Sequence, residues 1–193
     1  MKKFQLLLFA LAVSFIAGLQ CVNAATSGNR PLKASAKLPE FSTETGEATY
    51  YYVKFLRSGK VMSVGASDNC IRLYDATGTE TQQWKLIGTQ ENFQFQNMAG
   101  DYIVVSSQSI STTEGGNNPT PLRTSASKQP GGFKLQTAPN TSNGAGWEIV
   151  ANSKNGNNVV NLWGSPGTGN TIGFWQTNDA NNVVTFVKPD TEI

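Results

Sequence analysis

The stretch GKVMSVGASDNCIRLYDATGTETQQW, residues 59–84, alternates short apolar runs with clusters of turn-forming residues. β-Branched and aromatic residues suit a pleated, half-buried surface, whereas Gly, Asn and Asp suit tight turns such as those around Asn69 and Gly78. Short runs separated by turn signals predict strands joined by hairpins. The runs are residues 61–64, 71–74 and 84–87.

The same pattern extends outward from this stretch over the rest of the chain. Folded sequence is expected to begin at Thr49, where the β-rich run of residues 50–55 starts, and to end near residue 190. After the N-terminal apolar segment, no stretch sustains the 3.6-residue apolar period of an amphipathic helix. Frequent short strands without helices predict an all-β barrel or sandwich.

The strand pattern also repeats. Three similar motifs, each with an apolar pair around a polar residue, close successive blocks at Trp84, Phe133 and Val184, which are 49 and 51 residues apart. Each block has room for four strands, so we expect three four-stranded units around a shared barrel, capped by hairpins. In such a barrel Trp84, Phe133 and Phe186 are expected to pack in the core.

Residues 59–64, residues 71–74 and the triplet Gln82-Gln83-Trp84 together resemble one repeat of a ricin-type β-trefoil lectin. In that family a Gln-x-Trp triplet closes each repeat. The first repeat matches it fully, whereas Gly131-x-Phe133 and Asn182-x-Val184 depart from it. The resemblance covers about residues 49–190. It implies a β-trefoil of three four-stranded repeats and, as its function, carbohydrate binding.

The resemblance also implies where a sugar would bind in the third repeat. In the family, each site combines an acidic residue, a Gln, a stacking aromatic and an Asn before the closing triplet. Gly173 replaces the Gln and is expected to open space. The residues expected to bind sugar here are Asn161 at the acidic position, Trp175 at the aromatic position, Asn181 at the Asn position and Trp163 as a second ring on the side of Asn161. The alternative is that both tryptophans simply cover the barrel.

The other two repeats match less completely. In the first repeat Tyr74 is expected to stack and Arg72 to donate from the Gln position, although Ser63 and Thr81 replace the acidic residue and the Asn. The second repeat has no aromatic residue at the stacking position, so no sugar site is expected there. Its residues 111–130 are expected to form an enlarged loop. Such a loop offers an alternative function, a protein-binding trefoil that acts as a protease inhibitor or adhesion domain.

Catalysis is disfavoured by composition. The chain has no His, which excludes His-based nucleophilic, acid–base and metal chemistry. The folded part has one Ser-x-x-Lys, at Ser125 and Lys128, within a turn-rich segment. We therefore expect no enzyme activity, no metal and no cofactor. The carboxylates considered for glycoside hydrolysis mostly fall in turns, as at Asp68, Asp75, Asp101 and Asp179.

The N-terminus has the layout of a cleavable secretory signal over residues 1–24. Lys2 and Lys3 precede an apolar run at residues 4–19, and small residues place cleavage after Ala24. Gln20, rather than a small residue, precedes Cys21, which disfavours a bacterial lipoprotein. The mature domain is expected to be secreted, periplasmic or on the cell surface. Its polar residues 25–48 are expected to form a flexible tether.

Cleavage would also change the charge balance. The whole chain has 15 basic and 13 acidic residues; removing Lys2 and Lys3 leaves 13 of each. A neutral domain lacks the basic surface expected for nucleic acid or an anionic membrane, and its apolar leader is too short to span one stably. Cys70 would have no partner for an intrachain disulfide. A carbohydrate is the expected partner, with a protein partner or a purely structural envelope role as alternatives.

Overall fold

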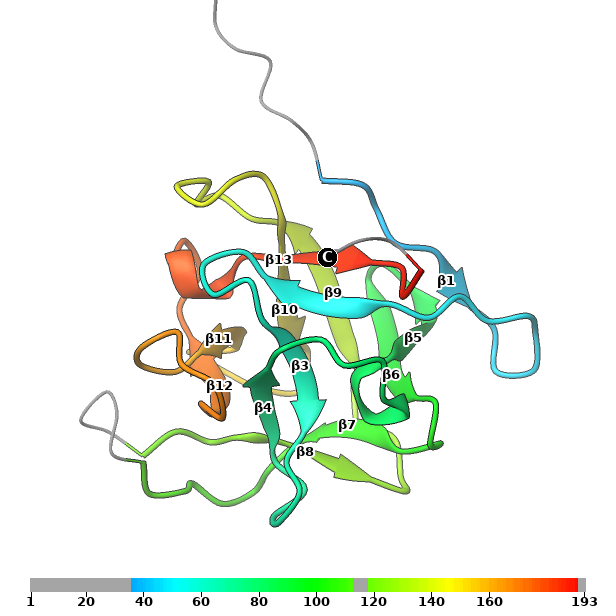
Figure 1. The fold of residues 1–193 in the computed structure, drawn as a ribbon, viewed down its shortest axis with the longest axis horizontal. Helices are drawn as coiled ribbons and strands as arrows, with labels where there is room; N and C mark the ends of the chain where they lie inside the picture. The colour runs from blue at the N-terminus through cyan, green and yellow to red at the C-terminus, as the bar shows by residue number, and fades with distance from the viewer. Residues whose placement is uncertain (1–35, 113–117, 191–193) are drawn as a thin grey trace, which may run out of the picture. The chain divides into compact units, whose positions relative to one another are not determined.

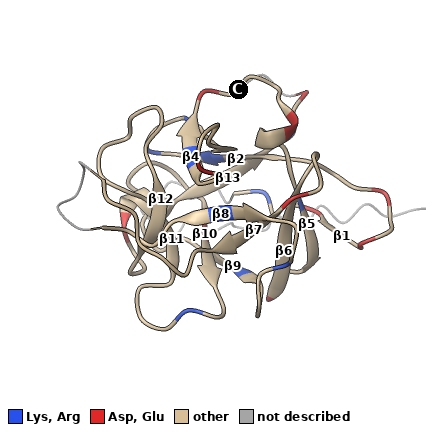
Figure 2. Ribbon diagram, turned by 90° about the horizontal axis from the view of Figure 1, so that it is seen from below, with Lys and Arg blue, Asp and Glu red and all other residues tan. Residues whose placement is uncertain are grey.

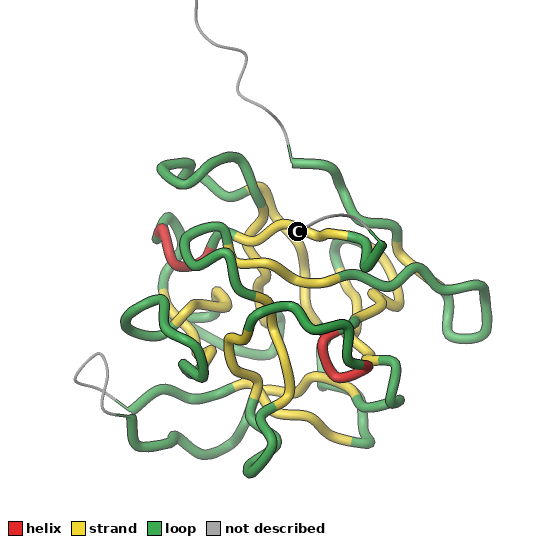
Figure 3. The backbone as a smooth tube through the Cα atoms, in the orientation of Figure 1, coloured by secondary structure: helices red, strands yellow, loops and turns green. Residues whose placement is uncertain are grey.

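The computed structural model describes residues 36–112 and 118–190, all within the unit Lys33–Ile193. The predicted signal peptide and residues 25–35 lie outside the described residues. Figures 1 and 3 show short strands joined by loops, with two 3₁₀ turns, η1 (Glu80–Gln82) and η2 (Ala180–Asn182). The strands are β1 (Phe41–Ser42), β2 (Tyr52–Phe55), β3 (Val61–Val64), β4 (Ile71–Tyr74), β5 (Trp84–Thr89), β6 (Asn92–Asn97), β7 (Tyr102–Val105), β8 (Leu122–Ser125), β9 (Phe133–Thr137), β10 (Trp147–Ala151), β11 (Val159–Leu162), β12 (Ile172–Trp175) and β13 (Val184–Val187).

Six strands pair into a closed barrel. β5, β6, β9, β10, β13 and β2 follow one another as antiparallel neighbours, and a bridge between Tyr51 and Trp84 joins the two ends. Six further strands form the hairpins β3–β4, β7–β8 and β11–β12, each paired to a barrel strand of its own repeat. The three repeats are therefore β2–β5, β6–β9 and β10–β13. This arrangement confirms the predicted three units of four strands.

The closing motifs supply much of the core. Trp84 and Phe133 are completely buried, as the sequence predicts, and the indole Nε1 of Trp84 donates to the carbonyl O of Met62 at 3.2 Å. Phe93 and Phe95 pack edge to face at 5.0 Å between their ring centroids and extend this aromatic cluster. Phe186 is only partly buried and packs against the core from its edge. The buried aromatic residues of the first two repeats thus form one cluster within the core.

Each repeat also buries one amide side chain near its closing motif. Gln82 accepts from the backbone N of Thr77 at 2.7 Å and donates to the carbonyl O of Asp75 at 2.9 Å. Gln129 accepts from the backbone N of Val105 at 2.6 Å. Asn182 donates to the carbonyl O of Gln176 at 2.9 Å. A buried amide that bonds to neighbouring chain fixes the path of the segment leading into the closing strand.

The ordered fold begins ahead of Thr49, where the sequence places its start. β1 pairs in parallel with β5, and the Phe41 ring meets Phe93 edge to face at 5.5 Å. The backbone N of Glu40 donates to the hydroxyl of Tyr51 at 2.9 Å. Residues 36–48, assigned from composition to the tether, thus contain a segment that packs on the barrel. The packing of Phe41 and the two residue pairs between β1 and β5 offset the entropy lost on ordering this segment. Composition alone does not reveal these contacts.

The expected enlarged loop at residues 111–130 requires a similar correction. Its second half contains β8, which pairs with β7 from Tyr102–Ser125 to Val105–Leu122. Leu122 is almost fully buried in the core. The segment is therefore the long connection and return strand of the second hairpin rather than a loop throughout. The pattern was hidden because β8, with the sequence LRTS, has only one large apolar residue.

Candidate functional site

Strand β4 lies between the other two repeats. Cys70, just before it, forms a bridge with Arg123 of the second repeat, and Arg72 forms one with Thr171 of the third. The β11–β12 turn is also hydrogen-bonded to β4: the backbone N of Gly169 donates to the carbonyl O of Leu73 at 2.6 Å. The turn of the third hairpin is thereby attached along the edge of the first.

The side chain of Arg72 reinforces this junction. Its Nη1 donates to the carbonyl O of Gly169 at 3.0 Å and to Oγ1 of Thr171 at 3.2 Å, and its Nη2 donates to Oδ2 of Asp68 at 2.5 Å. The hydrogen bond from Arg72 lowers the pKa of Asp68 from 3.8 to about 2, because it stabilises the carboxylate. Arg72 is thus a paired cation, held in place by residues of the first and third repeats.

A cleft of about 280 Å³ opens beside this junction. Trp163 and Arg72, predicted to serve separate sites in different repeats, both line it. Ser111 and Thr112, from the start of the long second-repeat connection, complete one side. The remaining lining residues come from the third hairpin turn and are Gly169, Asn170 and Thr171. The cleft therefore combines a ring, a guanidinium and several hydroxyl and amide groups.

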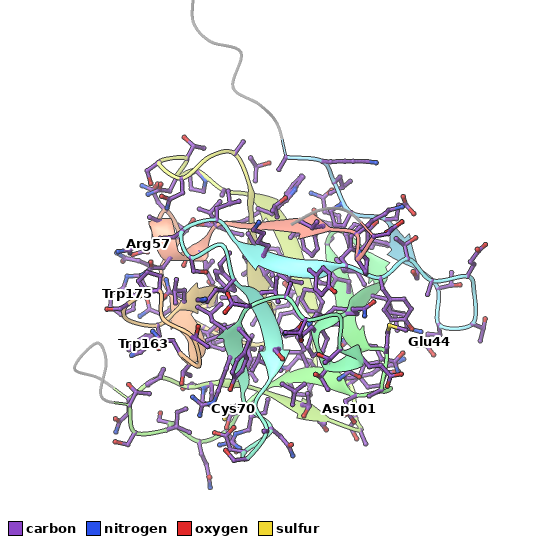
Figure 4. The ribbon with its side chains drawn as sticks, in the orientation of Figure 1. Glu44, Arg57, Cys70, Asp101, Trp163 and Trp175 are labelled. Carbon is purple, nitrogen blue, oxygen red and sulfur yellow. The ribbon has the colours of Figure 1, made fainter. Side chains whose placement is uncertain are left out.

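The two tryptophans of the third repeat lie together, as Figure 4 shows at the edge of the unit. Their ring centroids are 6.0 Å apart and their planes are inclined by 77°, an edge-to-face contact. Trp163 is 9% exposed and Trp175 is half-buried. Trp175 does not line the cleft and instead supports Trp163 from the side.

Gly173 does not open space at this site, contrary to expectation. A Cβ added there would lie 2.9 Å from the Cβ of Pro119 and 3.3 Å from Cε3 of Trp163. The missing side chain is therefore replaced by Pro119 from the second repeat. Because this contact joins distant parts of the chain, the local pattern around Gly173 could not reveal it.

The predicted amide residues are engaged elsewhere. Asn161 is 4% exposed, and its Nδ2 donates to Oδ1 of Asn182 at 2.8 Å in the interior. Its amide is thus an internal group, which corrects the expectation that it faces a sugar. Asn181 is nearer the surface, where its Oδ1 accepts from Nη1 of Arg57 at 2.5 Å. Neither residue lines the cleft.

Tyr74 lines a second hollow, of about 340 Å³, on the other side of the same hairpin turn. Ser63, which stands at the acidic position of the resemblance in the first repeat, also lines it, as does Gln82 of the closing triplet. Thr168 belongs to this hollow, whereas its neighbour Gly169 belongs to the cleft. Arg72 lines the cleft and Tyr74 lines this hollow, so the two residues that the sequence predicts for one first-repeat site line two adjoining hollows.

Several lining residues were missed by sequence reasoning. Asn170 and Thr171 belong to the turn-rich stretch SPGTGNT, residues 165–171, which signals a hairpin turn but not its neighbour. Ser111 and Thr112 had no signal, because their position depends on the path of the second hairpin. The stretch Gly167–Thr171 could have been examined as a polar surface turn between two strand runs.

Comparison with known proteins gives the fold an independent reference. No protein-family model and no curated protein sequence match this chain. Among solved structures, the designed threefold protein ThreeFoil has a TM-score of 0.56 at 18% identity, covering 72% of this chain and 97% of that one. The Macrolepiota procera ricin B-like lectin, in complex with lactose, has a TM-score of 0.55 at 17% identity (76% and 100% covered). The Rhizoctonia solani agglutinin has a TM-score of 0.54 at 18% identity (76% and 99% covered).

Within residues 36–112 and 118–190, no three or more His, Cys, Asp or Glu side chains are grouped so that they could hold a metal ion. In the same part of the chain, no helix combines the length and apolarity needed to cross a membrane. From the barrel, its three hairpins and these structural neighbours, the fold is a β-trefoil.

Proposed function

We propose that this chain is a non-catalytic carbohydrate-binding domain whose sugar contacts Trp163 of the third repeat. The observation that carries the proposal is the cleft that Trp163, supported by Trp175, lines together with Arg72 and the polar Asn170–Thr171 turn. The M. procera lectin, which shares the fold, is seen in complex with lactose. These features support a lectin-like function.

The chemistry of the cleft suits a sugar. The C–H face of a sugar ring packs on an aromatic ring, and its hydroxyls need fixed donors and acceptors, because unpaired hydroxyls are costly to desolvate. Hydroxyl, amide, guanidinium and backbone groups converge beside Trp163. The volume of about 280 Å³ is near the lower end of ligand pockets, about 300 Å³, and therefore fits one sugar unit.

The cleft is better suited to binding than to catalysis. Among the residues that the structure describes, its lining offers no carboxylate, Cys or His to act as a general acid or an activated nucleophile. Arg72 is the charged residue within the described lining, and Asp68 pairs with it. A single small cleft of this kind is expected to bind a monosaccharide weakly, with Kd on the order of millimolar to high micromolar.

The test is a glycan array followed by titration with lactose and the array hits. Ser111 is exposed and lines the cleft, so Ser111→Trp should fill the cleft and abolish binding without removing a core contact. Ser127→Trp, an equally exposed serine outside the cleft, is the matched control and should bind normally. Trp175→Ala should weaken binding several-fold, because Trp163 loses its lateral support.

Two results would overturn this proposal. The first is that the mature protein binds no glycan on the array. The second is that glycan binding is unchanged in Ser111→Trp. A protein partner that is captured by the wild type and by Trp175→Ala, without any glycan binding, would instead favour the protein-binding alternative.

The proposal includes export of the domain, through the predicted signal at residues 1–24. Intact mass of the protein purified from the culture fluid and membrane fractions of its natural source tests this. A mature chain that begins at Ala25 is the expected product. A chain that retains residues 1–24, or carries lipid on Cys21, would contradict it.

A further inference from the structure

The cleft and the Tyr74 hollow share one dividing turn. Thr168 lines the Tyr74 hollow, and the next three residues of the turn line the cleft. Two backbone hydrogen bonds to Leu73 fix the turn to β4. The backbone N of Gly169 donates to the carbonyl O of Leu73 at 2.6 Å, and the backbone N of Leu73 donates to the carbonyl O of Asn170 at 3.0 Å. The divider is therefore part of the sheet edge.

The two hollows also share strand β4. Arg72 lines the cleft and Tyr74 lines the hollow, and both side chains leave the same face of β4, because alternate residues of a strand point the same way. Two residues along a strand span about 6.5 Å. A ligand bound in one hollow would thus have its end close to the edge of the other hollow.

The charged side chains that line the two hollows, in the part of the chain that the structure describes, are each paired. Arg72, the charged lining residue of the cleft, is paired with Asp68 at 2.5 Å. Asp75, the charged lining residue of the Tyr74 hollow, is paired with Lys60 at 2.7 Å. Figure 2 shows basic and acidic residues scattered around the ribbon. Because each lining charge already has a counter-ion, an acidic ligand gains little extra attraction here.

We infer that the two hollows form one extended site for a neutral oligosaccharide, which crosses the third hairpin turn from Trp163 to Tyr74. This inference rests on the proposed function and adds to it the length and charge of the ligand. One sugar unit occupies the cleft, and a later unit of the same chain packs against Tyr74. Linking two weak contacts in one ligand raises affinity above that of either alone.

Chain length is the first variable of the test. Titration uses homologous neutral series from one to six units (galacto-, manno-, xylo- and cello-oligosaccharides), together with each array hit and its sialylated form. The wild type should bind the longer members of the recognised series at least tenfold more tightly than the monosaccharide. A sialylated form should bind no more tightly than its neutral parent.

Separate blocking of the two hollows is the second variable. Ala66 is exposed and lines the Tyr74 hollow, so Ala66→Trp should reduce long-chain affinity to the monosaccharide level and leave monosaccharide binding intact. Tyr74→Ala removes the ring instead of filling the hollow and should act in the same direction. Ala99→Trp, at an exposed turn outside both hollows, is the matched control. Far-UV circular dichroism and urea unfolding verify that each variant folds.

The outcomes separate this inference from the proposed function. Equal affinity for one unit and for longer chains, or no effect of Ala66→Trp and Tyr74→Ala on long chains, would overturn the extended site and keep a single-sugar lectin. A sialylated chain that binds at least tenfold more tightly would overturn the neutral class. Loss of monosaccharide binding in Ala66→Trp, with retention in Ser111→Trp, would place the sugar in the Tyr74 hollow alone. Binding of no sugar of any length is the failure of the proposed function itself.

Discussion

The side-chain amide of Asn182 donates to Oε1 of Glu148 at 3.1 Å inside the third repeat, where neither residue is exposed. Glu148 receives three further hydrogen bonds, from Nε2 of Gln136, Oγ1 of Thr177 and the backbone N of Asn178. All four donors are neutral, so the carboxylate is buried by hydrogen bonding rather than by an ion pair. This network fixes the segment that runs from Trp175 to the closing strand β13.

Removing the Glu148 carboxylate should therefore destabilise the domain strongly. Glu148→Ala leaves the buried donors unpaired and is expected to lower the free energy of unfolding by about 3–5 kcal/mol. Glu148→Gln keeps the shape but turns an N–H towards one of those donors, at a cost of about 1–3 kcal/mol. Urea unfolding measures both values. The exposed Glu91→Ala is the control and should stay within about 0.5 kcal/mol of wild type; a similarly small effect of Glu148→Ala would refute the role given to this network.

The Asp68–Arg72 pair should give stability a distinct acid dependence. Because Arg72 lowers the pKa of Asp68 from 3.8 to about 2, the folded state favours the carboxylate. The pair's contribution is then complete above pH 4 and is lost as pH falls towards 2. Allowing for the 30% exposure of Asp68, it amounts to about 1–2 kcal/mol.

Asp68→Asn tests this dependence. At pH 5–6 the variant should unfold at lower urea concentration than wild type, and the difference should shrink steadily between pH 4 and pH 2. A constant difference in unfolding free energy between variant and wild type over that range would show that protonation of Asp68 does not cause the acid dependence.

The repeat structure was readable from the sequence because it depends on local features. Gly, Asn and Asp mark the hairpin turns, and the spacing of Trp84, Phe133 and Val184 marks the repeat. The two triplets that depart from Gln-x-Trp still mark repeats that bury an amide side chain near the closing strand. Gln129, two residues before Gly131, supplies the buried amide in the second repeat, and Asn182 supplies it in the third. A shifted or shortened amide serves the same purpose without matching the motif.

The arrangement of the site was less readable because it depends on contacts between repeats. Trp163 and Arg72 were both identified from the sequence, but nothing local showed that they line one cleft. Asn161 occupies the position of a ligand-binding acidic residue, yet its amide bonds to Asn182 in the interior. Pro119 fills the space left at Gly173. Each of these outcomes was decided by a residue from another strand or repeat, beyond the reach of a local pattern.

Two adjacent glycines should respond differently to the same substitution. Gly131 and Gly132 both have positive φ, +73° and +63°, so Ala at either position costs about 1–2 kcal/mol in backbone strain. At Gly132 the new Cβ would also lie 2.8 Å from the carbonyl O of Phe93, whereas at Gly131 the nearest atom is 3.5 Å away. Gly132→Ala should therefore cost a further 1–3 kcal/mol or so. Equal unfolding free energies for the two variants would contradict the close approach at Gly132.

The N-terminal segment should contribute measurably to stability, although its composition resembles a tether. Phe41→Ala removes the ring that packs edge to face on Phe93 and is expected to lower the free energy of unfolding by about 1–3 kcal/mol. Leu38→Ala, three residues earlier and 42% exposed, is the matched control and should change it by less than about 0.5 kcal/mol. Urea unfolding of the two variants beside wild type is the measurement. If Phe41→Ala is as mild as Leu38→Ala, β1 is not an integral strand of the domain, and the fold begins at Thr49 as the sequence alone indicates.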